Sequence, residues 1–302
     1  MIQEPEQSST EKRLWHCVNF GEPLDLRTGV AEDDDVAHAR ARPEERCIRG
    51  DFLAFLLLRV EDGTRTHIPV LRLRGARITG PLVLTGADIG KTLVLEQCFL
   101  EEAPELSDAR TRSIQIIRSS LPGLDARHVN VDGQLDLTGT VVTGRMGLVN
   151  AHVTGELIMN GCVLNNPEDW TFFAGGIIVD GGFFARHGFE SQGGIRLVGA
   201  RLNGGLFLDH VLLTATAGGA LVADNLKVEG RIICDGLVAH GEVRLPGARI
   251  NGQLSWNSAI IRATDTGLDC RRLVAEELIL TPAEPIKGIV DLGNARVSVF
   301  VR

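Results

Sequence analysis

The sequence predicts an all-β protein: a parallel β-helix (β-solenoid) of short strands, with half-coils of about 11 residues and an N-terminal α-helical cap. Two observations predict it. Three stretches share the pattern R-L-x-G-A-R-[IL]-x-G and begin at Arg72, Arg196 and Arg244, and repetition of one unit along a chain is typical of solenoids. Leucines in L-x-L alternations also recur every 11 residues from Leu71, whereas helical repeats run about 33 to 47 residues.

Each unit contains two short apolar alternations, and side chains along a strand alternate between its faces. Strands of two or three residues are too short to be stable alone, but they can pair above and below when coils stack. We therefore expect two units, about 22 residues, to form one coil with four short sides. A thin core of this kind suits a chain that is 44% hydrophobic yet only 5% aromatic, with 35 glycines available for its corners.

Over residues 1–69 the sequence predicts a lead-in followed by a helical cap. Ser8, three residues before Glu11, forms a capping-box pattern, and the apolar spacing that follows predicts a helix over about 9–19. The acidic run at 32–35 predicts a solvated loop.

Pro43 can begin a second helix, which we expect over about 44–59. Its apolar stripe would consist of Ile48, Phe52, Phe55 and Leu56. Such a stripe needs a partner, and the open end of a solenoid needs a cover because it exposes core and unpaired strand edges. We therefore expect this helix to cap a solenoid that occupies 70–302.

An aromatic insertion at 165–190 interrupts the repeat. A chain poor in aromatic residues concentrates six of them there: Trp170, Phe172, Phe173, Phe183, Phe184 and Phe189. Exposed, they would mark an interaction surface. Buried, they would fill an irregular coil.

Several of these stretches together resemble a known family. The R-L-x-G-A-R-[IL]-x-G units, the L-D-L-R-T-G opening at Leu24 and the I-R-G-D-F-L-A-F-L-L-L stretch at Ile48 resemble actinobacterial repeat proteins often described as "membrane-associated oxidoreductases". The resemblance implies a redox activity, and it implies membrane association only for chains that carry a hydrophobic C-terminal extension. More loosely, the expected coils are similar to those of bactofilins and pentapeptide-repeat proteins.

The residues themselves indicate no catalytic, cofactor-binding or metal-binding site. The six cysteines are single, as in a protein of the reducing cytoplasm, and the resemblance extends this expectation to the inner face of the membrane. The glycine clusters precede strands rather than the helix that a dinucleotide site requires. A glycosidase-like site needs two carboxylates about 5 to 10 Å apart. The candidates do not fall at the same place in their units: Asp180, Asp209, Asp224 and Asp235.

Arginines mark two positions of the strong units. Those expected to point outward from the first alternation are Arg72, Arg196 and Arg244, and those in the corner are Arg77, Arg201 and Arg249. If two units make a coil, one side of the solenoid would be rich in arginine. These arginines would either bridge neighbouring carboxylates or form a docking face for an acidic or phosphate-bearing partner.

Three functions remain open. We favour a non-catalytic scaffold or binding module that presents long solenoid faces to a protein partner. The first alternative is self-association in the manner of bactofilins, tail to tail through an open C-terminal end, because the chain alternates to its last residues without a second cap. The other is a carbohydrate-active or redox enzyme. The net charge of −8 argues against a nucleic-acid partner, and we expect no cofactor.

Overall fold

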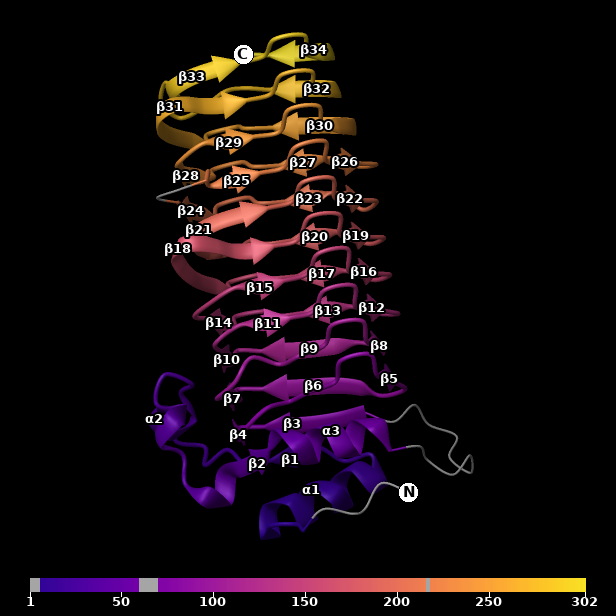
Figure 1. Ribbon diagram of the computed structural model, residues 1–302. Helices are drawn as coiled ribbons and strands as arrows, with labels where there is room; N and C mark the ends of the chain where they lie inside the picture. The colour runs from indigo at the N-terminus through magenta and orange to yellow at the C-terminus, as the bar shows by residue number, and fades with distance from the viewer. Residues whose placement is uncertain (1–5, 60–69, 216–217) are drawn as a thin grey trace.

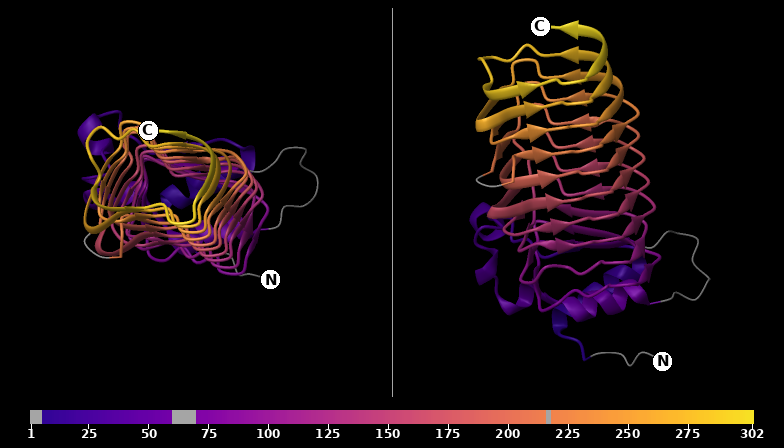
Figure 2. Two further views of the ribbon diagram at one scale, coloured as in Figure 1. Left: turned by 90° about the horizontal axis from the view of Figure 1, so that it is seen from above. Right: turned by 45° about the horizontal axis from the view of Figure 1, so that its top comes forward.

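The computed structural model describes residues 6–59, 70–215 and 218–302. Parallel strands stack coil upon coil into a β-solenoid of about ten turns, which rises from the helices near the N-terminus to the last strands of the chain (Figure 1). Seen from above, the coils superpose in an angular outline around one narrow interior (Figure 2). The predicted fold class is confirmed. The predicted lead-in over 1–5 and the join over 60–69 lie outside the described residues.

Two parallel sheets form the walls of the solenoid, and each wraps around a corner to cover two sides. The first sheet has 19 strands: β1 (Leu24–Asp25), β3 (Val70–Arg74), β5 (Asp88–Ile89), β6 (Thr92–Glu96), β8 (Arg110–Thr111), β9 (Ile114–Ile117), β12 (Asn130–Val131), β13 (Leu135–Asp136), β16 (His152–Val153), β17 (Leu157–Ile158), β19 (Ile178–Val179), β20 (Phe183–Phe184), β22 (Arg201–Leu202), β23 (Leu206–Phe207), β26 (Lys227–Val228), β27 (Ile232–Ile233), β30 (Arg249–Ser255), β32 (Val274–Ile279) and β34 (Arg296–Val301).

The second sheet has 15 strands: β2 (Cys47–Arg49), β4 (Arg77–Thr79), β7 (Phe99–Leu100), β10 (Ser120–Leu121), β11 (Leu124–Asp125), β14 (Val141–Val142), β15 (Met146–Gly147), β18 (Val163–Phe173), β21 (Glu190–Arg196), β24 (Leu212–Thr214), β25 (Leu221–Val222), β28 (Val238–His240), β29 (Val243–Arg244), β31 (Ile260–Asp269) and β33 (Lys287–Asp291).

The strand register confirms that two 11-residue units make one coil. Val70 pairs with Thr92, 22 residues on, and Leu135 pairs with Leu157 at the same interval. Inward side chains of successive coils therefore lie above one another, and they form a single continuous core of aliphatic residues. The coil in which the aromatic insertion begins is longer: residues 165–173 belong to the long strand β18, which pairs with β21 through two register shifts.

The cap contains three helices: α1 (Ser9–Phe20), α2 (Ala31–Asp34) and α3 (Gly50–Leu58), with 3₁₀ turns at Ala39–Ala41 and Glu44–Arg46. The capping box at the start of α1 is confirmed, because Ser8 accepts from the Glu11 N–H and the Glu11 carboxylate accepts from the Ser8 N–H. Helices α1 and α3 lie beneath β3 and cover the lower end of the core (Figure 1).

The second helix begins later than expected, at Gly50 rather than near Pro43. The preceding residues form β2, in which Ile48 pairs with Ile78 of β4. Pairing with the next coil satisfies the backbone of this segment, so the apolar Ile48 faces the core from a strand instead of a helix. The cap thus contributes the first strand of both sheets, and the expected boundary at residue 70 does not separate the hydrogen-bonded walls.

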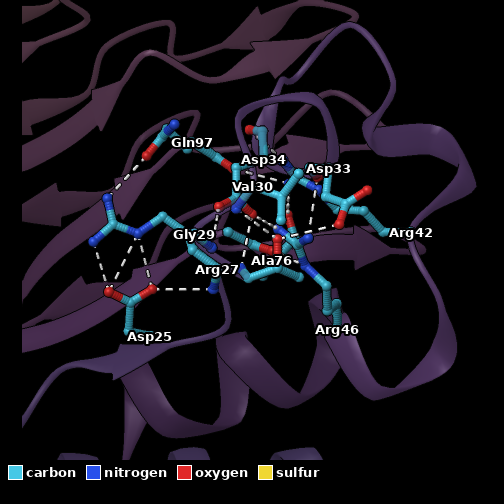
Figure 3. A network of polar contacts seen from close by, with 12 residues as sticks. Asp25, Arg27, Gly29, Val30, Asp33, Asp34, Arg42, Arg46, Ala76 and Gln97 are labelled. Atoms are coloured by element: carbon cyan, nitrogen blue, oxygen red, sulfur yellow. Dashed lines mark hydrogen bonds and ion pairs between the residues drawn. The ribbon is translucent and has the colours of Figure 1, made fainter.

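A network of polar contacts joins the cap to the first coil (Figure 3). The buried Arg42 guanidinium donates to the carbonyls of Ala76 (3.0 Å) and Gln97 (2.8 Å). Arg46, also buried, donates to the Gly75 carbonyl at 2.9 Å and to Asp34 Oδ1 at 2.9 Å. The two arginines therefore reach into the corner after β3 and hold it against the cap.

Asp34 is the charged partner within this network, and it corrects the prediction that residues 32–35 form a solvated loop. Its carboxylate is buried and accepts from the N–H groups of Thr28 (3.1 Å) and Gly29 (2.9 Å) as well as from Arg46. Burial alone would raise its pKa, but these donors outweigh burial and hold the pKa of Asp34 below its ordinary value.

We predict that Asp34→Ala destabilises the protein by roughly 3–5 kcal/mol, because it leaves the buried Arg46 without a charged partner. Chemical denaturation measures the loss. Glu102→Ala, which changes an exposed acid outside the helices and strands, is the control and should change the free energy of unfolding by no more than about 0.5 kcal/mol. Equal unfolding midpoints for Asp34→Ala and wild type would contradict the assignment.

The stability that Asp34 contributes should also depend on pH. Because its folded-state pKa is lowered, Asp34 stabilises the fold above the unfolded value of about 3.9, and that contribution is lost as the pH falls through the folded value. Asp34→Asn should therefore lose less stability than wild type on acidification below about pH 4.

Candidate functional site

Two of the six predicted arginines bridge carboxylates. Arg77 pairs with Glu101 of the next coil. Arg244 forms a two-pronged contact with Asp224, with Nε and Nη2 at 2.8 and 2.7 Å from the two carboxylate oxygens. Their charges are neutralised within the solenoid, so neither contributes a free cation to a docking face.

The predicted single arginine-rich side is wrong. Arg72 lies on β3 of the first sheet, whereas Arg196 and Arg244 lie on β21 and β29 of the second. Because two units make one coil, the same motif can begin on either sheet. The coils between Arg72 and Arg196 differ in length, so the motif that begins on the first sheet at Arg72 begins on the second sheet at Arg196.

The structure instead lines up the two corner arginines Arg201 and Arg249 with a residue that the motif search missed. Arg201 pairs in register with Lys227, and Lys227 pairs with Arg249, on strands β22, β26 and β30. All three side chains are exposed. We call these three residues the basic ladder. A looser pattern, [RK]-[LIV]-x-G, would have found Lys227, since it occupies the same place in its unit.

The basic ladder holds like charges on adjacent coils. Neighbouring strands lie about 4.8 Å apart, and like charges directly opposite are destabilising, by about 1 kcal/mol per pair at 4 Å in water. Among the described residues, no ion pair or hydrogen bond engages these three side chains. The carboxylates of Asp180 and Glu229 beside them accept from asparagine side chains instead. An anion laid along the ladder would relieve the repulsion.

The six predicted aromatic residues separate into two sets. Phe172, Phe183 and Phe189 are buried and fill the enlarged coil, as the second of the two interpretations expected. The half-buried set comprises Trp170, Phe173 and Phe184. Trp170 and Phe173 adjoin on β18, with ring centroids 6.4 Å apart, whereas Phe184 lies on β20 of the first sheet. These rings therefore occupy two places on the solenoid rather than one continuous patch.

Phe184 stacks on Phe207 of the next coil, a residue outside the insertion. The ring centroids lie 4.9 Å apart and the planes are inclined by 5°. The Arg186 guanidinium lies 4.4 Å from the Phe207 centroid and also pairs with Asp209 at 2.6 Å. Coil spacing thus brings flat outward side chains into face-to-face contact.

Phe173 lies between arginines of the neighbouring coils. The Arg196 guanidinium is 5.0 Å from its ring centroid and that of Arg145 is 5.8 Å away. The same ring lines a surface hollow of about 460 Å³ together with Arg127, Arg145 and Gly147. Here the structure joins one predicted arginine to one predicted aromatic residue.

The candidate carboxylates are engaged by neighbours. Asp180 Oδ2 accepts a hydrogen bond from His152 Nε2 at 2.7 Å, and Asp224 pairs with Arg244. Asp209 and Asp235 do occupy equivalent places on consecutive coils, contrary to expectation, because their neighbours Phe207 and Ile233 pair in register. Asp209 pairs with Arg186 and Asp235 accepts from Ser255, so both carboxylates are held by side chains of the wall.

Burial shields four of the six cysteines from reaction. Cys98, Cys162, Cys234 and Cys270 are buried, and burial raises the pKa of Cys98 to about 11 and that of Cys162 to about 12. A thiol must ionise to react. In the part of the chain that the structure describes, no group of His, Cys, Asp or Glu is arranged to hold a metal ion.

Comparison of the chain with protein-family models, with curated proteins and with solved structures finds no match. Within residues 6–59, 70–215 and 218–302, no helix combines the length and the apolar character that a membrane crossing requires. A function must therefore be argued from the surface that the coils present.

We predict that a thiol reagent applied to the native protein modifies Cys17 and Cys47 first and the other four thiols only after unfolding. Cys17 and Cys47 are partly exposed, whereas the other four thiols are buried. Reaction of the buried thiols therefore requires the coils around them to open. The rate of labelling with and without denaturant measures the difference. Labelling of all six at one rate would show that the core is accessible.

Proposed function

We propose that the protein is a non-catalytic binding module whose basic ladder docks an acidic protein partner. The observation that supports the proposal most strongly is the stack of Arg201, Lys227 and Arg249, three exposed cations in register without a carboxylate partner among the described residues. Several other arginines of the solenoid are paired with acids of neighbouring coils, as Arg77 is with Glu101.

The spacing of the basic ladder suits a particular partner. Its charges repeat along the solenoid axis at about 4.8 Å, and an α-helix advances about 5.4 Å per turn. A row of glutamates one turn apart on a helix lying along the axis would meet the three cations in order. Charge-assisted contacts of this kind are the stronger hydrogen bonds of proteins.

The same coils present apolar side chains across the corner. Phe207 follows Arg201 and Ile233 follows Lys227, each six residues on and each half-buried on the next side of the first sheet. An amphipathic partner helix would place its acidic row on the ladder and its apolar edge toward this second column. Apolar contact would add affinity, and the charges would orient the partner.

We predict that Arg201→Glu/Lys227→Glu/Arg249→Glu weakens binding of a helical peptide with glutamates one turn apart by about tenfold or more, because attraction becomes repulsion. Fluorescence anisotropy of the labelled peptide measures it. The control is Arg13→Glu/Arg40→Glu/Arg72→Glu, which changes three exposed arginines and the net charge equally. Unchanged binding by the first variant, or equal loss by both, would contradict the proposal.

A second candidate function is tail-to-tail self-association, and the last coil favours it. Val290 and Phe300 pair with Leu268 and Leu278, which are buried, yet they are themselves 39% and 50% exposed. The outer edge of β34 is also unpaired among the described strands. A second copy related by a two-fold axis would cover both features, because its own β34 would run antiparallel to the first.

We predict that the chain forms a dimer in sedimentation and that Phe300→Lys dissociates it, since the substitution places a charge in a desolvated contact. Val83→Lys, which changes an exposed apolar residue on the side of the solenoid, should leave the dimer intact. A wild-type chain that stays monomeric over the whole concentration range would exclude this function.

A further inference from the structure

One outward column of the second sheet has a gap. Its residues stack in register from coil to coil, and every position has a side chain except Gly147. In order the column reads Val83, Glu105, Asp125, Gly147, Phe173, Arg196, Val222, Arg244, Asp269 and Asp291. The missing side chain leaves the hollow of about 460 Å³ between Asp125 and Phe173.

The backbone does not require glycine at this position. The φ of Gly147 lies outside the left-handed region, and a Cβ built there would meet its nearest atoms at 3.8 to 4.0 Å, an ordinary contact. The nearby Gly144 is different, since its Cβ would lie 2.3 Å from the Pro122 carbonyl oxygen. Glycine weakens a strand and often marks a place where a ligand approaches closely. At 147 its effect is to keep the hollow open.

The hollow has the thickness of one flat group. Asp125 and Phe173 lie on coils two steps apart, about 9.6 Å at the usual strand spacing, and atoms in contact need about 3.5 to 4.0 Å on each side. A planar group at the level of Gly147 would therefore touch the Phe173 ring. The stack of Phe184 on Phe207, at 4.9 Å and 5°, shows the same packing elsewhere in this solenoid.

The charges around the hollow favour an anion. The Arg145 side chain is 56% exposed, and its nearest carboxylate, that of Asp169, is 3.8 Å away, beyond hydrogen-bond distance. Arg127 donates to Asp125 from Nε and Nη2 at 2.8 and 2.7 Å and retains Nη1. Arg196 adds a third cation beside the Phe173 ring. Asp125 is neutralised by Arg127, so the remaining charge is positive.

We propose that this hollow binds a small planar aromatic acid. The ring of the ligand stacks on Phe173 in the space above Gly147, and its carboxylate accepts hydrogen bonds from Arg145 and Arg127. A flat ring fits the thickness of the gap, and Arg127 and Arg145 favour an anionic ligand over a neutral or cationic one. The site lies on the second sheet, away from the basic ladder of the first, and does not depend on the proposed docking function.

The test uses 2-naphthoate as the probe, with binding measured by calorimetry on the full chain. Gly147→Val should abolish binding because the side chain fills the hollow, and it should keep or raise the melting temperature because it introduces no strain. Gly90→Val is the matched control, since a Cβ there meets nothing within 4 Å and its φ, like that of Gly147, lies outside the left-handed region. Arg145→Ala should weaken binding by about tenfold or more, the effect of one lost charge-assisted hydrogen bond.

Two related probes test the chemistry of the ligand. Cyclohexanecarboxylate keeps the anion without the flat ring, and 2-naphthalenemethanol keeps the ring without the anion. Both should bind more weakly than 2-naphthoate by about tenfold. Absence of 2-naphthoate binding to the wild type, unchanged binding by Gly147→Val, or equal binding of all three probes would overturn the proposal. The charge-reversed ladder variant should bind 2-naphthoate as the wild type does.

Discussion

The hydrogen-bond ladder between successive coils is the constraint on which this structure depends. Each short strand has its N–H and C=O groups satisfied only by the coils above and below it, as where Leu135 and Leu157 pair in register. Strands of two residues cannot stand alone, so the coils must stay in register from end to end. Side chains of the regular coils consequently lie above equivalent ones, whether they point into the core or outward, and exceptions occur at register shifts such as those between β18 and β21.

Outward columns inherit this constraint, and their chemistry follows from it. Opposite charges stabilise a column, as in the series Asp25, Arg74 and Glu96, where Arg74 Nε lies 2.9 Å from the Glu96 carboxylate. Flat rings stabilise it by stacking, as Phe184 and Phe207 do. A column of like charges, or a column with a missing side chain, has neither ion pairs nor ring stacking to stabilise it. The basic ladder and the Gly147 hollow are two places, among the described residues, where a column lacks such stabilisation, and both proposals start from that deficiency.

The two ends of the solenoid differ in how far the core is covered. At the lower end, α1 and α3 cover the core, and the buried Arg42 and Arg46 bind the carbonyls of the first corner. A guanidinium has enough donors to satisfy several carbonyls at once, so two side chains can replace part of a missing coil. At the upper end the last coil leaves Phe300 half exposed. This asymmetry is the physical basis for the tail-to-tail alternative.

The sequence by itself determined the fold class, the 11-residue unit and the capping box at Ser8, because each depends on residues close together in the chain. It could not place outward residues beside one another. Between coils of the solenoid, the neighbour of a side chain lies from 20 residues away (Arg110 to Asn130) to 27 (Val163 to Glu190), and each inserted or deleted residue changes which pairs meet. Only the tertiary structure could bring Lys227 between two arginines, bury Asp34 against Arg46, and show that the gap at Gly147 borders an aromatic ring. The reason is that the length of every coil between two residues determines whether they meet, whereas the formation of each strand depends only on the local alternation of apolar and polar residues.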